Sequence, residues 1–488
     1  PGDRGAVLSP TQTNPMETKN LYIHTIGCQM NVYDAEKMAA GLEGLHYLPV
    51  ASAEAADLIL LNTCAIREKA EQKVFSYLGR LAPLKTRNPR LIVAVGGCVA
   101  QQEGRRLLER VPHVDLVFGT HAIERLPALV GKIQRERCRL VDVAMTEGLR
   151  ELAAGTPRGV SGAVSRFVTV MQGCDNYCTY CVVPYVRGRE ASRTPERIVA
   201  EIEALVASGV HEVTLLGQNV NSYGLKEGLC SFAELLARVD ALPGLARIRF
   251  TTSHPKDLCD SLIQAFGRLP KLCNHIHLPV QSGADRVLKK MNRRYTRADY
   301  LEKVRRLREV RPDIAITSDF IVGFPGETAA DFHQSLDLIR QVDFDGVFAF
   351  MYSDRPTAPA ARFADKVAAA EKKHRLQTLL ALQDLNTIRK NRSLMGTVQR
   401  ILVDGAGKKP GDGPSDDGPP APQWVGRTTT NKIVHFSWPD AAPGLPIVQP
   451  GQLIDVRIEN AFAHSLRGRP LERQAPATGA KGEQSHAA

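Results

Sequence analysis

Three cysteines at the spacing C-x3-C-x2-C, namely Cys174, Cys178 and Cys181, are the side chains in this sequence best suited to metal chemistry. Thiolates bind zinc and iron–sulfur clusters, but a closed structural zinc site takes four protein ligands. Residues 139–210 hold no further cysteine, and no histidine, that could act as a local fourth ligand. Either a residue distant in the sequence completes the site, or one iron of a [4Fe–4S] cluster stays open for a small molecule.

The stretch from Cys174 to Cys181 resembles the radical-SAM signature. In that signature the open iron binds the amino and carboxylate groups of S-adenosylmethionine (SAM), so the resemblance implies the same use here. Tyr180, immediately before the third cysteine, would place an aromatic ring against the bound molecule. Because cysteine spacing alone decides a metal only loosely, a structural zinc site stays open as the alternative.

A βα series is expected over residues 19–142, the first domain. Buried-strand patterns at 21–26, 57–61, 91–95 and 115–118 alternate with helical patterns near 32–43, 67–84, 101–110 and 122–133. This alternation predicts a doubly wound parallel sheet.

A second cysteine trio, Cys28, Cys64 and Cys98, follows three of these predicted strands directly. The carboxyl ends of parallel strands meet at one edge of a sheet, so the three thiols are expected to converge. A lone free cysteine is usually a core residue, but three in register favour a second three-thiolate cluster with an open iron.

The second domain is expected at 165–392, after a linker at 143–164. Its strand patterns lie at 166–171, 212–216, 247–251, 275–280, 314–320 and 346–351. Six βα units predict a partial (βα)6 TIM-like barrel with its chemistry at the strand carboxyl ends. Polar residues at those ends are together candidate SAM contacts, although each alone fits a turn or a satisfied polar group better than a SAM contact. They are Gln218, Asn219, Ser253, Gln281 and Asp319.

The third domain, at 393–468, reads as short strands that predict a small antiparallel β-barrel, a common RNA-binding scaffold. Arg427, Lys432, His435 and Phe436 are its candidate RNA contacts, with an ordinary barrel face as the alternative. We expect a mobile loop at 405–423 and disordered tails at 1–18 and 469–488.

The charge balance is compatible with a polyanionic partner or with an ordinary basic surface, and charge alone favours the basic surface. The net charge is +11, and residues 161–392 alone carry 33 basic and 26 acidic side chains. Arg293 and Arg294 lie in the densest basic cluster and are further candidate RNA contacts, although a solvated basic face explains the same charge.

The remaining composition indicates the compartment. No run of 18 apolar residues occurs and the first residues lack the pattern of a signal peptide, so we expect a cytoplasmic protein without a membrane partner. The ten cysteines fit metal thiolates in a reducing compartment better than a disulfide framework.

Residues 20–468 as a whole resemble the MiaB family of tRNA-2-methylthio-N6-dimethylallyladenosine synthases. The matching stretches are Gly27–Asn31, Leu61–Lys69, Val95–Ala100, Cys178–Tyr185, Leu216–Asn221, Thr251–Pro255, His277–Gly283, Ser318–Thr328 and Ser465–Gly468. The resemblance implies a methylthiotransferase domain, a radical-SAM domain and a C-terminal TRAM domain. It also implies that Cys28, Cys64 and Cys98 hold an auxiliary [4Fe–4S] cluster and that the Cys174 trio holds the SAM-cleaving one. Ile26, where an aromatic residue is expected, and the long 405–423 loop depart from the pattern, and neither is a ligand.

The implied reaction adds a methylthio group at C2 of prenylated adenosine 37, beside the anticodon of tRNA. Two SAM would be consumed per product, together with a reductant such as a flavodoxin or ferredoxin and a sulfur donor, by a monomeric enzyme. Two alternatives remain. One is a sibling methylthiotransferase that acts on threonylcarbamoyl-adenosine in tRNA or on a ribosomal-protein aspartate. The other is a non-catalytic RNA-binding iron–sulfur protein, although an electron carrier normally closes all four cluster positions.

Overall fold

The computed structural model describes residues 18–65, 68–146, 148, 162–407, 423–438 and 448–471. The chain forms two compact units, the first made of Pro1–Gly159 with Val182–Gly188 and the second of Val160–Cys181 with Arg189–Ala488. The predictions for the 143–164 linker, the 405–423 loop and the two tails fall largely outside the described residues. In the part of the chain that is described, no helix is long and apolar enough to cross a bilayer.

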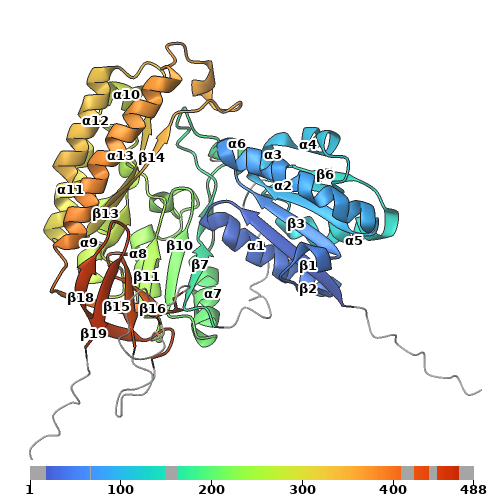
Figure 1. Ribbon diagram of the computed structural model, residues 1–488, viewed down its shortest axis with the longest axis horizontal. Helices are drawn as coiled ribbons and strands as arrows, with labels where there is room; N and C mark the ends of the chain where they lie inside the picture. Colours follow the sequence, from blue (N-terminus) through green and yellow to red (C-terminus); the bar gives the residue numbers. More distant parts are fainter. Residues whose placement is uncertain are drawn as a thin grey trace, which may run out of the picture. The chain divides into compact units, whose positions relative to one another are not determined.

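The first unit contains a parallel sheet in the order β2-β1-β3-β4-β5-β6 (Figure 1). Its strands are β1 Lys19–Ile26, β2 Tyr47–Pro49, β3 Leu58–Thr63, β4 Ile92–Gly97, β5 Leu116–Phe118 and β6 Leu140–Asp142. The parallel sheet is as predicted. The two edge strands β2 and β6 were not expected, because three residues are too few to show a strand period.

Helices cover both faces of this sheet because its strands are buried on both sides. Ile59 and Leu61 of β3 pack with Val74 and Leu78 of α2 (Glu68–Arg87) in one core. Leu58 and Leu60 face the opposite core, which contains residues of α1 (Gln29–Leu42) and α5 (Leu126–Glu136). Two cores around one sheet confirm the doubly wound prediction. The shorter helices α3 (Cys98–Glu103), α4 (Arg105–Arg110) and α6 (Val183–Val186) complete the unit.

The second unit contains six parallel strands in two three-stranded sheets, ordered β11-β10-β7 and β12-β13-β14. The strands are β7 Ser165–Thr169, β10 Glu212–Leu216, β11 Arg247–Phe250, β12 His275–His277, β13 Ala315–Val322 and β14 Gly346–Met351. A parallel bridge between Ile248 and Leu272 continues the series from one sheet to the next. All six strands match predicted ones, and the partial barrel is confirmed. A two-stranded sheet, β8 (Met171–Gln172) with β9 (Ala191–Ser192), flanks the cysteine loop.

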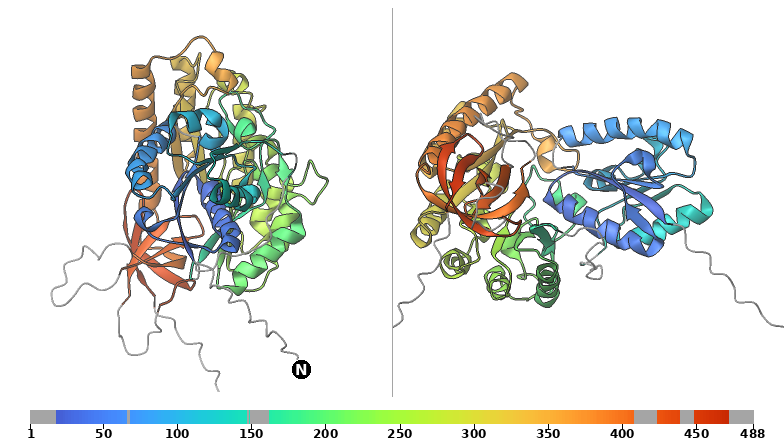
Figure 2. Two further views of the ribbon diagram at one scale, coloured as in Figure 1. Left: turned by 90° about the vertical axis from the view of Figure 1, so that its right-hand side faces the viewer. Right: turned by 60° about the horizontal axis from the view of Figure 1, so that its bottom comes forward.

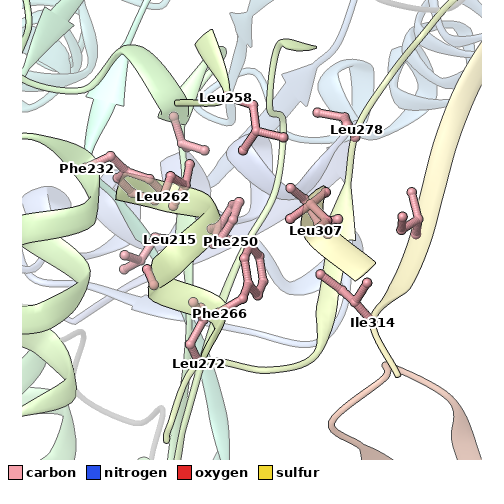
Figure 3. Close-up of a cluster of buried hydrophobic side chains, with 14 of the residues drawn as sticks. Leu215, Phe232, Phe250, Leu258, Leu262, Phe266, Leu272, Leu278, Leu307 and Ile314 are labelled. Atoms are coloured by element: carbon pink, nitrogen blue, oxygen red, sulfur yellow. The ribbon is translucent and has the colours of Figure 1, made fainter. Parts of the chain in front are cut away.

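Helices follow the barrel strands and bury a hydrophobic core against them, which includes several aromatic rings (Figure 3). They are α7 Pro195–Ala207, α8 Phe232–Asp240, α9 Asp260–Arg268, α10 Asp285–Lys290, α11 Arg297–Val310, α12 Ala329–Val342 and α13 Ala369–Arg392. Phe250 of β11 lies edge-on to Phe232 at 5.2 Å between ring centroids and 5.8 Å from Phe266. The fixed contacts of these rings hold β11, α8 and α9 together, and so hold the strand ends that carry the site.

Capping boxes set where three of these helices begin. Ser231, Thr296 and Thr328 precede α8, α11 and α12, and each side chain accepts the N–H of an acidic residue three positions later. The acidic side chain in turn accepts the backbone N–H of the capping residue, so two otherwise unpaired donors are satisfied at each helix start.

The C-terminal part of the second unit is a closed barrel in the order β15-β16-β17-β19-β18 (Figure 2). Its strands are β15 Val398–Ala406, β16 Gln423–Thr428, β17 Ile433–Ser437, β18 Leu453–Ala461 and β19 Leu466–Pro470. The barrel was predicted, but β19 was missed because its sequence, LRGRP, lacks alternating apolar residues. β19 closes the barrel by pairing with both β17 and β18.

Phe436 belongs to the core of this barrel and not to its surface. Its side chain is 1% exposed and packs with Ile401, Val434 and Val456. A buried ring cannot stack on a base, so the prediction of Phe436 as an RNA contact was wrong.

We predict that Phe436→Ala lowers the free energy of unfolding by about 3–5 kcal/mol, because a large buried ring leaves a cavity. Phe462, which is 53% exposed, provides the control, and Phe462→Ala should stay within about 0.5 kcal/mol of the parent. Denaturant unfolding measures both. A stable Phe436→Ala variant that had lost tRNA affinity would contradict the core assignment.

Candidate functional site

The first cysteine trio lies at the carboxyl ends of three adjacent strands. Cys28 follows β1 and caps α1, Cys64 follows β3, and Cys98 is the first residue of α3 after β4. Cys64 and Cys98 are buried, whereas Cys28 is partly accessible. The convergence predicted from sequence is present, because the strand register pairs Ile26 with Thr63 and Thr63 with Gly97, and the three cysteines follow these positions.

The surroundings of this trio shift the pKa values of Cys28 and Cys98 in opposite directions. The hydrogen bond from Cys64 lowers the pKa of Cys28 to about 6. Burial raises the pKa of Cys98, which is fully enclosed. A metal or cluster that carries positive charge would hold both as thiolates, since coordination deprotonates a thiol.

Two buried asparagines fix the backbone around the trio. The side-chain amide of Asn31 donates to Asn62 Oδ1 at 3.0 Å and to the Thr63 carbonyl at 3.1 Å, and Asn62 Nδ2 donates back to the Asn31 carbonyl at 2.7 Å. Asn31 Oδ1 also accepts from the Cys28 backbone N–H at 3.3 Å. Both residues stand in motifs of the sequence, but only their burial reveals this role.

Gly97 allows the strands beside Cys98 to approach closely. Its φ is +91°, and a Cβ at this position would lie 2.3 Å from the Thr63 carbonyl oxygen. Any other residue would push β3 and β4 apart at the end where Cys64 and Cys98 meet.

The second cysteine trio occupies the loop after β8, in the second unit. The N–H of Gly173 donates to Gln218 Oε1 at 2.6 Å, and Asn176 Nδ2 lies 3.5 Å from the sulfur of Cys174. Thr179 anchors the loop through its side-chain bond to the Lys290 carbonyl at 2.9 Å. Burial raises the pKa of Cys174 to about 12. The loop is therefore held at several points before any ligand binds.

Neither trio is arranged for a single ion. Among the described residues, no three His, Cys, Asp or Glu side chains form a group that could hold one metal ion. Each cysteine of a [4Fe–4S] site binds a different iron, so a cluster requires a wider spread of sulfur atoms than one zinc ion does.

Arg293 lies beside the second trio and is not a surface residue. Its guanidinium donates to the Pro279 carbonyl at 2.6 Å and to the Tyr295 hydroxyl at 2.9 Å, and Nη1 lies 3.4 Å from the sulfur of Cys178. The residue is 4% exposed. The prediction of Arg293 as an RNA contact was wrong, because charge clustering along the sequence does not distinguish a buried arginine from an exposed one.

Tyr180 is positioned between this arginine and an apolar cluster. Its hydroxyl lies 3.3 Å from Arg293 Nη1, and its ring packs against the cluster that contains Val287, Met291 and Phe324. Burial raises the pKa of Tyr180 well above its ordinary value, so the hydroxyl stays protonated. The ring thus has a fixed place directly beside Cys178 and Cys181.

The five predicted SAM contacts fall into two groups at the strand ends. Asn219 and Ser253 are buried after β10 and β11, and Gln218 supports the cysteine loop. The Gln281 backbone N–H donates to the Asp319 carbonyl at 2.8 Å, so these two residues are neighbours. Asp319 Oδ2 lies 3.4 Å from His277 Nε2.

Four buried polar atoms at these ends have no hydrogen-bond partner among the described residues. They are Asn219 Oδ1, Asn221 Oδ1, Ser253 Oγ and His254 Nε2. Burial, with Arg293 nearby, lowers the pKa of His254, so its ring is neutral. An unsatisfied buried polar atom costs about 1–3 kcal/mol, so four in two adjacent segments indicate that a polar ligand completes them. SAM, with amino, carboxylate and ribose groups, fits this donor and acceptor set. Asn221 and His254 were not singled out from the sequence as SAM contacts.

The barrel residues predicted to bind RNA are only partly available. The ammonium of Lys432 lies 2.9 Å from Asn391 Oδ1 and 3.5 Å from Asp345, and its side chain is 14% exposed, so its role as an RNA contact stays a prediction. Arg427 is 39% exposed beside Asp404, and His435 is half-buried. Arg294, in the central domain, is exposed.

Two family models match ranges of the chain that contain the two cysteine trios. Residues 168–339 match the radical SAM superfamily, and residues 20–119 match a family described only as uncharacterized protein family UPF0004. The tRNA-2-methylthio-N6-dimethylallyladenosine synthase of Desulfosudis oleivorans is 54% identical over 94% of this chain and 98% of its own. The Geobacter metallireducens synthase is 52% identical over 92% of this chain and 98% of its own. The chain belongs to this family.

Membership in the synthase family confirms the resemblance first inferred from the motifs. It also confirms the enzyme class, a radical-SAM tRNA methylthiotransferase, and its cofactors, SAM and [4Fe–4S] clusters. The non-catalytic alternative is thereby excluded. Among solved structures, the radical SAM methyltransferase TsrM of Kitasatospora setae has a TM-score of 0.54 at 16% identity, covering 71% of this chain and 74% of its own. At that identity the likeness supports the fold alone.

We predict that Arg293→Met leaves the salt dependence of tRNA binding unchanged, because the buried guanidinium contacts no phosphate. Arg294→Met, its exposed neighbour, should reduce the slope of log K against log salt by about 1, as for the loss of one phosphate contact. Binding titrations over a salt series measure both slopes. An equal loss of slope in the two variants would contradict the burial of Arg293.

Proposed function

We propose that this synthase-family chain converts N6-dimethylallyladenosine at position 37 of tRNA to its 2-methylthio derivative, with two SAM consumed per product. The observation that carries the proposal is that each compact unit has its own trio of cysteines beside parallel-strand ends. Cys174, Cys178 and Cys181 would hold the SAM-cleaving cluster, and Cys28, Cys64 and Cys98 the auxiliary cluster.

The chemistry requires a radical because C2 of adenine carries an unreactive C–H bond that no side-chain base removes at pH 7. When bound, one [4Fe–4S] cluster supplies the electron that splits SAM into methionine and a 5′-deoxyadenosyl radical, and the other supplies sulfur. In the proposed scheme the C2 hydrogen would leave as part of 5′-deoxyadenosine, and a second SAM would donate its methyl group to the sulfur by displacement and leave as S-adenosylhomocysteine.

The residues of this chain bind and orient the reactants. SAM would supply hydrogen-bond partners for four buried polar atoms that have none among the described residues, those of Asn219, Asn221, Ser253 and His254. Tyr180 fixes one wall of the site, and Arg293 anchors the cysteine loop to the Pro279 carbonyl. In this arrangement the protein positions the reactive groups and excludes water, and the cofactors carry the difficult step.

A prenylated adenosine is the substrate that we favour over the threonylcarbamoyl analogue of the sibling enzymes. Burying five prenyl carbons contributes about 4 kcal/mol at ~0.8 kcal/mol per carbon. An apolar pocket that accepts them would reject a carboxylate, because desolvating a charge is costly. The names of the Desulfosudis and Geobacter relatives specify the dimethylallyl nucleoside.

The proposed partners follow from the reaction. A flavodoxin or ferredoxin would deliver the electron, and a sulfur donor would replace the consumed sulfur. A tRNA substrate places the reaction in the cytoplasm. We propose that the enzyme acts as a monomer.

We predict that anaerobically reconstituted protein holds about eight irons, as two [4Fe–4S] sets. Replacing Cys174, Cys178 and Cys181 by Ala should halve the iron and abolish 5′-deoxyadenosine formation. Replacing Cys28, Cys64 and Cys98 by Ala should also halve the iron but preserve reductive SAM cleavage. Iron assay and chromatography of the products test both variants. If the first variant still cleaved SAM, the assignment of roles would be refuted.

We predict that anticodon stem-loops bearing dimethylallyladenosine are methylthiolated at C2, whereas threonylcarbamoyl stem-loops are not. Purified enzyme, SAM and reductant are incubated with each RNA, and the nucleosides are analysed by mass spectrometry. S-Adenosylhomocysteine and 5′-deoxyadenosine should each form once per product. Turnover of the threonylcarbamoyl RNA alone would assign the chain to the sibling family, and a product without the S-methyl group would exclude the two-SAM scheme.

A further inference from the structure

Residues Val182–Gly188, which we call the strap, belong to the first unit although they directly follow Cys181 in sequence. Val182 and Val186 are buried in the core that also contains Cys98 and Val99. Thr120 Oγ1 donates to the Val186 carbonyl at 2.6 Å, and His121 Nε2 lies 3.0 Å from the carbonyl oxygen of Arg187. The strap is therefore an integral part of the first unit's packing.

The strap places the side chain of Arg187 inside the auxiliary site. Its guanidinium Nη2 lies 2.7 Å from Asp34 Oδ2, and the two side chains are 4% and 9% exposed. Asp34 stands in α1, the helix that Cys28 caps. The charge of the guanidinium favours the thiolate forms of Cys98 and Cys28. One buried cation thus faces two members of the trio.

Stability alone does not explain this pair. A buried ion pair is rarely more stable than apolar side chains of the same volume, because both charges lose their hydration. The pair Arg249–Glu212, which is also buried, gives its other N–H groups to the carbonyls of Thr428 and Thr429 and so joins β11 to the C-terminal barrel. Arg187 instead directs its charge to sulfur.

We propose that Arg187 is a positioning residue for the auxiliary cluster, which donates a hydrogen bond to the Cys98 thiolate and raises the cluster's reduction potential. The proposal rests on the proposed function, in that it takes Cys28, Cys64 and Cys98 as the ligands. Three thiolates on a [4Fe–4S]²⁺ core give a net charge of −1, and reduction adds one more negative charge. A hydrogen bond to sulfur and an adjacent cation stabilise the reduced state more than the oxidised one. Asp34 orients the guanidinium and offsets part of its charge.

The test uses the full-length chain with Cys174, Cys178 and Cys181 replaced by Ala, so that only the auxiliary cluster is present. Its midpoint potential is measured by redox titration followed by electron paramagnetic resonance. Arg187→Gln should lower the equilibrium constant for reduction at least tenfold, which is about 59 mV for one electron. Arg187→Lys keeps the positive charge and should lower the midpoint potential by less than Arg187→Gln does. Asp34→Asn leaves the guanidinium unopposed and should shift the potential in the opposite direction.

Arg249→Gln is the matched control, since it breaks an equally buried ion pair in the second unit and should leave the potential unchanged. If Arg187→Gln retained its iron and the parent potential, the proposal would be overturned. If Arg187→Gln lost its iron while its melting temperature equalled that of Arg249→Gln, the result would support the proposal. If the parent of the series bound no iron, the ligand assignment under the proposed function would fail instead, so the two failures are distinguishable.

Discussion

Parallel strand pairing is the constraint on which both sites depend. Because β1, β3 and β4 pair in parallel, their carboxyl ends lie along one edge of the sheet. The residues that follow these strands are therefore neighbours in space although they are far apart in the sequence. Cys28, Cys64 and Cys98 need no local motif beyond their position after each strand. The close approach at Gly97 and the buried amides of Asn31 and Asn62 then fix the backbone to which these thiols are attached.

In the second unit, parallel strand pairing positions a set of polar side chains as well as the cysteine loop. Its strand ends bring together buried polar atoms that have no hydrogen-bond partner in the described part of the chain, a cost in stability that a bound polar ligand would offset. Arg293 and Tyr180 couple this rim to the cysteine loop. An arginine can fill this position because its planar guanidinium donates to carbonyl, hydroxyl and sulfur acceptors at the same time and stays charged at any physiological pH.

Much of this arrangement could be predicted from the sequence, and the exceptions have physical causes. Long apolar runs such as Leu58–Leu61 identified the central strands, whereas β2, β6 and β19 are too short or too polar to show a period. The cysteines were recognisable because thiol spacing is a direct chemical signal. Arg293 and Phe436 were misassigned, since residue type says nothing about which face of an element is buried.

The strap makes the first unit discontinuous in sequence. A fragment that ends within residues 143–164 would contain all six strands of the sheet and the cysteines at positions 28, 64 and 98, yet it would lack Val182, Val186 and Arg187. Such a fragment would expose part of its own core and leave Asp34 buried without its cation, a loss that costs about 3–5 kcal/mol when a buried pair is broken. The first unit is thus defined by folding and not by a contiguous stretch of chain, and any recombination of such units between enzymes must transfer residues 182–188 as well.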